Sequence, residues 1–248
     1  EGAAWITLLS GAKLRAGSGP ESLRFVYNLK SPYRKGRYHE ILRNFEIVKG
    51  IGNEDEKIEF IPYIYDCASE KIKSFYDSEK IKQGFTIGVH PGASKKSKRW
   101  ASGRFAEVIK RLVYIYDINF IVFYGKEEYD DAAFIVNSVG SHKVMLNPST
   151  ASLSDLIFSI SKCDLFFSNN SGPMNLAVSI GVPVVALLGS THPDDWGPYG
   201  EKHRIIRSPL YLNSYSEDDE RTAMSAISTS QVFDLLNKRI SELYKNNK

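Results

Sequence analysis

The stretch that decides the fold is Asp164 to Gly200, which reads D-L-F-F-S-N-N-S-G-P-M-N-L-A-V-S-I-G-V-P-V-V-A-L-L-G-S-T-H-P-D-D-W-G-P-Y-G. A short apolar run over 165–167 predicts a buried strand, and apolar residues at helical spacing over 174–180 predict a helix. A second buried strand is predicted over 183–188, with a polar loop after it. In a parallel α/β sheet, the loops that follow both strands emerge at the carboxyl edge, where such folds bind ligands.

The polar loop 168–172 leads into the N-terminus of the predicted helix. The free backbone N–H groups and the helix dipole favour an anion at this place. Ser171 can cap the helix, and Pro173 suits its first turn. Asn175 follows Ser171 by four residues, so both project on the same side. These residues fit an anion site, and they equally fit an ordinary capped helix after a buried strand.

The same stretch resembles the signature of the heptosyltransferase family, glycosyltransferases that build the lipopolysaccharide inner core from ADP-heptose. The family pattern is matched at Ser171, Gly172, Leu176, Ala177, Gly181, Pro183, Gly189 and Thr191. The chain departs from it at Asn170, where the family usually has Asp, and at Asn175, where it usually has His. The resemblance implies that Asn170, Ser171, Gly172, Asn175 and Thr191 bind the phosphates and sugar of the donor.

A second loop, H-P-G-A-S-K-K-S-K-R-W over 90–100, follows a predicted strand at 85–90. Gly92 permits close backbone approach, Ser94 offers a hydroxyl and Lys98 offers a positive charge for phosphate. By composition alone a solvated basic segment is the favoured interpretation of this loop, and neither a Walker loop nor G-x-G-x-x-G occurs in the chain. The loop resembles the second signature of the family, which implies that Ser94 and Lys98 contact the donor diphosphate.

A carboxylate is expected beside the ribose, after the strand predicted at 119–124. Glu127 can accept both ribose hydroxyls there, as acidic residues do in dinucleotide sites. Glu128 is the alternative, and a glutamate in the first turn of a helix is also favoured by the helix dipole alone. The resemblance to the G-x-E motif of the family implies that Glu127 binds the ribose.

The reaction that the resemblance implies needs no metal and no cofactor, and no His/Asp/Glu cluster has metal-ligand spacing. Lysine and helix N-termini would stabilise the leaving diphosphate while a carboxylate deprotonates the acceptor hydroxyl. His192, Asp194 and Asp195 lie near the predicted sheet edge, but the family pattern singles none of them out. We therefore expect the base in the front half of the N-terminal domain of the family, upstream of Glu1.

The composition indicates a soluble globular protein, with 42% hydrophobic and 25% charged residues among 248. The net charge of +3 does not indicate a nucleic-acid partner. Cys67 and Cys163 lie outside any C-x-x-C pattern, which suits a reducing cytosol. No signal peptide is visible, and no apolar run reaches the roughly 18–20 residues of a membrane span. We expect a cytoplasmic protein, at most peripheral to the inner membrane.

Strands and helices alternate from 85 to 210, which predicts a doubly wound parallel sheet. The family resemblance implies that this is the Rossmann-like domain that binds the nucleotide sugar. Within it, Ser102 is expected to cap the helix that follows the basic loop. Residues 208–228 are polar and are predicted as a loop, so 211–248 is expected to be a loop followed by a helix over 229–244.

Residues 1–65 resemble the back half of the N-terminal, acceptor-binding domain of the family, with a strand at 25–27 and a helix over 38–49. An extended segment is expected at 58–62, and 66–84 is interpreted as a linker with an exposed helix. The resemblance thus implies an α/β fold of the GT-B type, with an incomplete N-terminal α/β domain.

The functional hypothesis is a heptosyltransferase-type enzyme that moves a sugar from a nucleotide-sugar donor, ADP-heptose by resemblance, to a lipopolysaccharide core acceptor. A catalytically silent nucleotide-sugar-binding module is the first alternative, favoured by Asn170, Asn175 and the missing front half. A nucleotide-sugar epimerase of GT-B type is the second, and the K-R-W and S-G-P-M signatures argue against it. The donor-site hypothesis requires four loops to meet at one sheet edge: 91–98, 125–128, 169–173 and 189–192.

Overall fold

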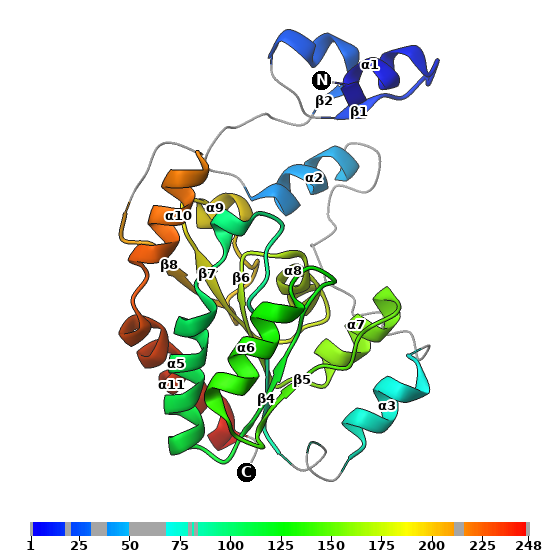
Figure 1. Cartoon of the computed structure of the whole chain (residues 1–248). Coiled ribbons are helices and arrows are strands. Elements are labelled where there is room, and N and C mark those ends of the chain that lie inside the picture. Colours follow the sequence, from blue (N-terminus) through cyan, green and yellow to red (C-terminus); the bar gives the residue numbers. More distant parts are fainter. Residues whose placement is uncertain are drawn as a thin grey trace.

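A six-stranded, fully parallel sheet forms the body of the protein (Figure 1). The computed structural model describes residues 2–17, 21–30, 39–49, 68–78, 81, 84–210 and 216–246. The strand order is β5-β4-β3-β6-β7-β8, the Rossmann order, in which the connections reverse direction between β3 and β6. The strands are β3 (Thr86–His90), β4 (Asn119–Val122), β5 (Val144–Leu146), β6 (Leu165–Asn169), β7 (Val184–Leu188) and β8 (Arg204–Arg207).

Helices cover both faces of this sheet, so its central strands β3, β6 and β7 are buried throughout. The two buried clusters divide the residues of each strand by alternation; for example, Phe167 belongs to one cluster and Phe166 to the other. On the Phe167 face lie α5 (Ser102–Ile115), α6 (Tyr129–Val139) and α11 (Thr229–Asn246). On the Phe166 face lie α7 (Leu153–Ser161) and α8 (Gly172–Ser179).

The predicted doubly wound sheet is confirmed, but Ser102 does not cap α5. Ala101 occupies the capping position with an extended backbone, and Ser102 is the first helical residue. The Ser102 hydroxyl donates instead to Asp131 Oδ1 of α6, at 2.7 Å. The serine therefore joins two helices rather than satisfying the N-terminus of its own.

The predicted loop over 208–228 is wrong, because α10 (Glu217–Ala226) lies within it. Ser216 caps this helix by accepting a hydrogen bond from Asp219 N at 3.2 Å, and four acidic residues follow in the first turn. Ala223 and Met224 bury its narrow apolar face. The capping serine and the acidic first turn are sequence signals for a helix, but the polar composition of the segment suggested a loop.

The N-terminal part contains α1 (Gly2–Leu9) and two short parallel strands, β1 (Ala16–Gly17) and β2 (Leu29–Lys30). The strand predicted at 25–27 is wrong, because 21–26 form the 3-10 helix η1 (Glu21–Val26). Three apolar residues are too few to fix a period, and here Val26 is buried while Phe25 is exposed. The segment predicted at 58–62 lies outside the described residues.

The predicted helix over 38–49 is confirmed as α2 (Glu40–Lys49), and His39 precedes it. The Nδ1 atom of His39 accepts from Ile41 N at 3.2 Å, so its Nε2 carries the hydrogen and donates to Gly197 O at 2.7 Å. This bond ties the start of α2 to the loop after α9 (Pro193–Trp196).

The linker helix is α3 (Glu70–Tyr76), and it is docked rather than exposed. Ile72 and Tyr76 are buried, and the Tyr76 hydroxyl donates to Asn147 Oδ1 at 2.7 Å. Asp155 of α7 accepts from Ser69 N at 2.7 Å, just before α3. In the described part of the chain, every helix is too short or too polar to cross a membrane.

Candidate functional site

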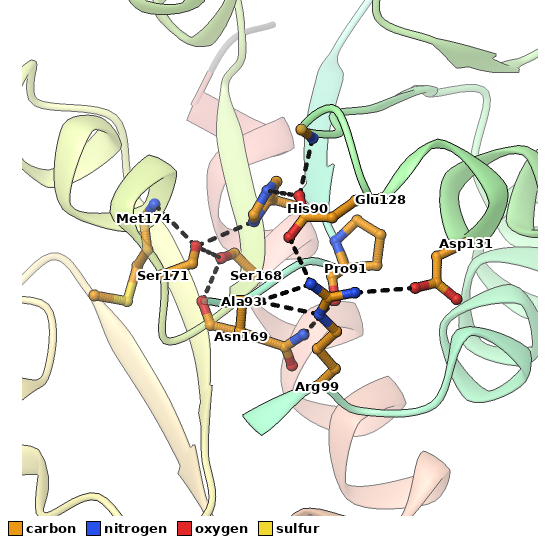
Figure 2. A network of polar contacts seen from close by, with 11 residues as sticks. His90, Pro91, Ala93, Arg99, Glu128, Asp131, Ser168, Asn169, Ser171 and Met174 are labelled. Atoms are coloured by element: carbon orange, nitrogen blue, oxygen red, sulfur yellow. Dashed lines mark hydrogen bonds and ion pairs between the residues drawn. The ribbon is translucent and has the colours of Figure 1, made fainter. Parts of the chain in front are cut away.

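The loops after β3 and β6 meet at the carboxyl edge of the sheet, at the point where the strand order reverses (Figure 2). Asn169, fully buried at the end of β6, holds them together. Its Nδ2 donates to Pro91 O at 2.6 Å, and its Oδ1 accepts from Trp100 N at 3.2 Å. One amide therefore fixes both ends of the 91–99 loop against the neighbouring strand.

A cleft of about 260 Å³ opens at this edge. Three of the predicted site residues, Ser94, Ser171 and Gly172, line it together. Its walls combine apolar side chains with a few polar groups, which is typical of pockets for small organic ligands. The lining residues are His90, Ala93, Ser94, Phe123, Tyr124, Gly125, Glu128, Thr150, Leu156, Ser171, Gly172 and Pro173.

The N-terminus of α8 faces this cleft, and Ser171 caps it as predicted. The Ser171 Oγ accepts from Met174 N at 3.5 Å and lies 3.1 Å from both Ser168 Oγ and His90 Nδ1. Pro173 occupies the first turn. The capped helix is therefore present, and its N-terminus also opens onto a cleft where an anion would be favoured.

Glu128 is the most strongly held group of the cleft (Figure 2). Its Oε2 accepts from Gly125 N at 2.9 Å and lies 3.2 Å from His90 Nε2, while its Oε1 lies 3.3 Å from Arg99 Nη2. The hydrogen bond from His90 is the main cause that lowers the pKa of Glu128 to about 2, against the opposing effect of burial. The carboxylate is therefore ionised at neutral pH.

Two glycines make room for this carboxylate. A Cβ atom on Gly92 would lie 2.1 Å from Glu128 Oε1, and one on Gly125 would lie 3.1 Å from Oε2. Glu127, the residue predicted beside the ribose, is exposed and does not line the cleft. Of the two glutamates that the sequence left open, the structure places Glu128 in the cleft.

A second, smaller pocket of about 10 Å³ lies at the same edge. It brings together three more of the predicted residues, Lys98, Asn170 and Thr191. Leu187, Gly189, Ser190, Glu220 and Met224 complete its lining. Asn175 is exposed on α8 and lines neither pocket. All four predicted loops thus contribute to the two pockets, as the donor-site hypothesis required.

Sequence reasoning missed His90, Arg99, Asn169 and Glu220. Arg99 lies in a basic segment that composition alone predicts to be solvated, yet its Nε and Nη2 donate to Ala93 O at 3.1 and 3.0 Å and its Nη2 lies 3.3 Å from Glu128 Oε1. The signal that was available is the position of His90 and Asn169 as the last residues of two buried strands. Among the described residues, no three His, Cys, Asp or Glu side chains are grouped as a metal site.

Comparison with known proteins gives one consistent result. The family model of glycosyltransferase family 9 (heptosyltransferase) matches residues 2–224. Lipopolysaccharide heptosyltransferase 2 of Salmonella typhimurium is 29% identical over 126 residues, 49% of this chain and 36% of that protein. Lipooligosaccharide heptosyltransferase 2 of Campylobacter jejuni is 32% identical over 128 residues, 50% of this chain and 40% of that protein.

The fold likeness extends further along the chain than the curated sequence matches. The structure of E. coli ADP-heptose lps heptosyltransferase II aligns with a TM-score of 0.68 and 22% identity, over 97% of this chain and 74% of that one. The matched segments of the two curated relatives, in contrast, span well under half of their lengths. The expected GT-B type of α/β fold is confirmed.

Proposed function

This chain belongs to glycosyltransferase family 9, the heptosyltransferase family, and on that premise we propose that it binds a nucleotide-sugar donor of the ADP-heptose class and takes part in heptose transfer to a lipopolysaccharide core acceptor. The observation that carries the proposal is the pair of pockets at the carboxyl edge of the sheet, one at the strand-reversal point and one at the end of β7. Six of the eight predicted donor-binding residues line one or the other: Ser94, Lys98, Asn170, Ser171, Gly172 and Thr191.

The larger cleft suits the nucleoside and the first phosphates. Phe123, Tyr124 and Leu156 offer apolar surface for a base, and the ionised Glu128 can accept hydrogen bonds from ribose hydroxyls. The N-terminus of α8 and the Ser94 hydroxyl are suited to phosphate oxygens. These groups have the chemistry of a nucleoside diphosphate site.

The smaller pocket has room for about one water molecule, so the distal phosphate and the sugar would lie over its mouth, against the polar groups that line it. Lys98 supplies a positive charge, and Asn170 and Thr191 supply hydrogen-bonding groups. In transfer, the acceptor oxygen forms a bond to the anomeric carbon while the bond from that carbon to the diphosphate breaks. Lys98 would stabilise the charge that develops on the leaving diphosphate.

The proton of the acceptor hydroxyl must pass to a base, and we assign this role to none of the described residues. That leaves a donor-binding module without transfer activity as the second candidate. The amides of Asn170 and Asn175 favour it, because they replace the acid and the imidazole of the family pattern and cannot transfer a proton near neutral pH.

Titration calorimetry with ADP tests the donor site. Lys98→Ala should weaken ADP binding by about 1.5–3 kcal/mol, the range for a hydrogen bond to a charged group. Lys95→Ala is the matched control, because Lys95 is an exposed lysine of the same loop. Equal ADP affinities in the wild type and in Lys98→Ala would contradict the assignment of the smaller pocket to phosphate.

Transfer is tested separately, with ADP-heptose, a deep-rough lipopolysaccharide acceptor and detection of both ADP and acceptor mass. We expect donor binding without transfer by these 248 residues alone, because none of the residues that the structure describes is assigned as the acceptor base. Acceptor-dependent ADP release with a matching mass gain would show this expectation wrong and would establish the enzyme over the silent module.

A further inference from the structure

Glu220 is a buried carboxylate that the donor-site assignment leaves without a role. It lies in the first turn of α10 with only 3% of its surface exposed, whereas Glu217 and Asp218 of the same turn are exposed. An ionised carboxylate loses hydration when it is buried and needs compensation from its neighbours. The next turn of the same helix buries Ala223 and Met224, so Glu220 lies on the buried face of α10, where an apolar side chain would be the usual choice.

The compensation comes from the loop that carries the predicted diphosphate ligand. Ser97 Oγ donates to Glu220 Oε2 at 2.7 Å, and Lys98 Nζ lies 3.8 Å from Glu220 Oε1. The ion pair is longer than a direct hydrogen bond, so the ammonium is held near Glu220 with its donors not fully used. The two oxygens of one carboxylate thus fix two successive residues of the loop.

The same helix also contacts the other loop of the smaller pocket. A Cβ atom on Gly189 would lie 2.9 Å from Met224 Sδ, so α10 packs directly on the loop that leads to Thr191. Glu220, Met224, Lys98 and Thr191 line one pocket. A single helix therefore joins the 94–98 loop to the 189–191 loop, at the carboxyl end of β7.

We propose that Glu220 is a positioning residue for Lys98: it is the counter-ion that holds the Lys98 ammonium in the smaller pocket before a diphosphate binds. This inference rests on the proposed donor site. Lys98 is one-third exposed, and a free lysine side chain loses considerable rotamer freedom when it is ordered by a ligand. Glu220 restricts that freedom in advance. Lys98 offsets the charge of Glu220, and we expect the loss of orientation to outweigh the loss of repulsion when the carboxylate is neutralised.

The test compares four forms of the whole chain by calorimetric titration with ADP: the wild type, Glu220→Gln, Lys98→Met and the double variant. Gln keeps the size of the side chain and an oxygen that can accept from Ser97, but it loses the charge. Glu220→Gln should weaken ADP binding by about three- to tenfold. This loss corresponds to a part of the side-chain entropy that a lysine loses when a ligand orders it. In the Lys98→Met background, the same change should not weaken ADP binding, because the ammonium that Glu220 orients is absent.

Glu217→Gln is the matched control, because it removes the same charge from the same helix at an exposed position. It should change ADP affinity by less than about twofold. Unchanged or tighter ADP binding in Glu220→Gln would overturn the proposal. An equal loss in both lysine backgrounds would overturn it as well, because Glu220 would then act through the fold and not through Lys98.

Urea unfolding of the same four proteins tests the pair without any ligand. The effects of the two substitutions on the unfolding equilibrium should be non-additive by about two- to fivefold, as for a partly exposed ion pair. Additive effects would contradict the pairing even if the wild type did not bind ADP. Failure of wild-type ADP binding together with a clear coupling would instead reject the proposed donor and keep the Glu220–Lys98 pair.

Discussion

The two pockets at the carboxyl edge are built in contrasting ways. In the larger cleft, the Glu128 carboxylate contacts His90, Arg99 and Gly125 N, and two glycines enclose it. In the smaller pocket, the Lys98 ammonium forms one ion pair among the described residues, 3.8 Å long, and one-third of its side chain is exposed. The carboxylate of the first pocket is fixed by a connected network, whereas the ammonium of the second is held by a longer, partly exposed contact.

This difference matches the two tasks that the proposed function gives them. A nucleoside is the same before and after transfer, so a rigid cleft loses nothing by being formed in advance. The distal phosphate gains charge as the bond to the sugar breaks, and an ammonium that can shift toward it can follow that change. Substitutions in the cleft should therefore have large effects on stability and on binding together, and those in the smaller pocket should mainly affect binding.

The largest effect is expected from Gly92→Ala. The new Cβ would lie 2.1 Å from Glu128 Oε1, and the carboxylate must then leave the place where three neighbours hold it. We expect a loss of about 2–3 kcal/mol in the free energy of urea unfolding, because hydrogen bonds to a charged group are broken.

ADP binding should weaken in the same variant, as calorimetry can measure. Gly103→Ala in α5 is the control, because its Cβ would meet nothing closer than 4.0 Å. That substitution should be neutral or stabilising by up to about 1 kcal/mol. A Gly92→Ala protein as stable as the wild type would show that the Glu128 carboxylate can move aside without losing stabilising contacts.

An intermediate effect is expected from Glu128→Gln, and it should depend on pH. The pKa of Glu128 is about 2 in the folded chain, below the ordinary value of 4.5, so its contribution to stability is present above pH 4.5 and is lost as the pH falls toward 2. At pH 7 the substitution should lower the free energy of unfolding by about 1–2 kcal/mol, the scale of a charged hydrogen bond.

Near pH 2 the difference between the two proteins should nearly vanish, which urea unfolding at pH 7, 4 and 2.5 can follow. Glu127→Gln is the matched control, since Glu127 is the exposed neighbour. A stability difference for Glu128→Gln that stays constant across this pH range would contradict the depressed pKa.

The sequence predicted the sheet and the meeting of the loops, and six of its eight predicted donor-binding residues line a pocket, because periodic apolar strands and a capped helix are local signals. It favoured Glu127 for the ribose, whereas the structure places Glu128 in the cleft, because which of two adjacent carboxylates turns inward depends on His90 and Arg99 from another loop. It missed α10, and Glu220 with it, because a polar segment hides a narrow apolar face. In both cases the deciding contacts join segments that are distant in the sequence, and the local residue pattern does not contain them.

The smallest effect separates the two asparagines at which the chain departs from the family pattern. Asn170 lines the smaller pocket, whereas Asn175 is exposed and lines neither pocket. Asn170→Ala should weaken ADP binding by about 0.5–1.5 kcal/mol, the usual range for one hydrogen bond. Asn175→Ala should change it by no more than about 0.5 kcal/mol, as expected for a surface substitution.

Calorimetry on this matched pair decides whether the family resemblance transfers residue by residue. Both side chains are amides of the same size, so only their placement differs. Equal losses of ADP affinity would mean that the exposed side of α8 belongs to the donor site, and that the site reaches beyond the two pockets. A loss at Asn170 alone would restrict phosphate recognition to the smaller pocket. Asn175 would then stand where the family pattern carries a histidine without sharing in donor binding.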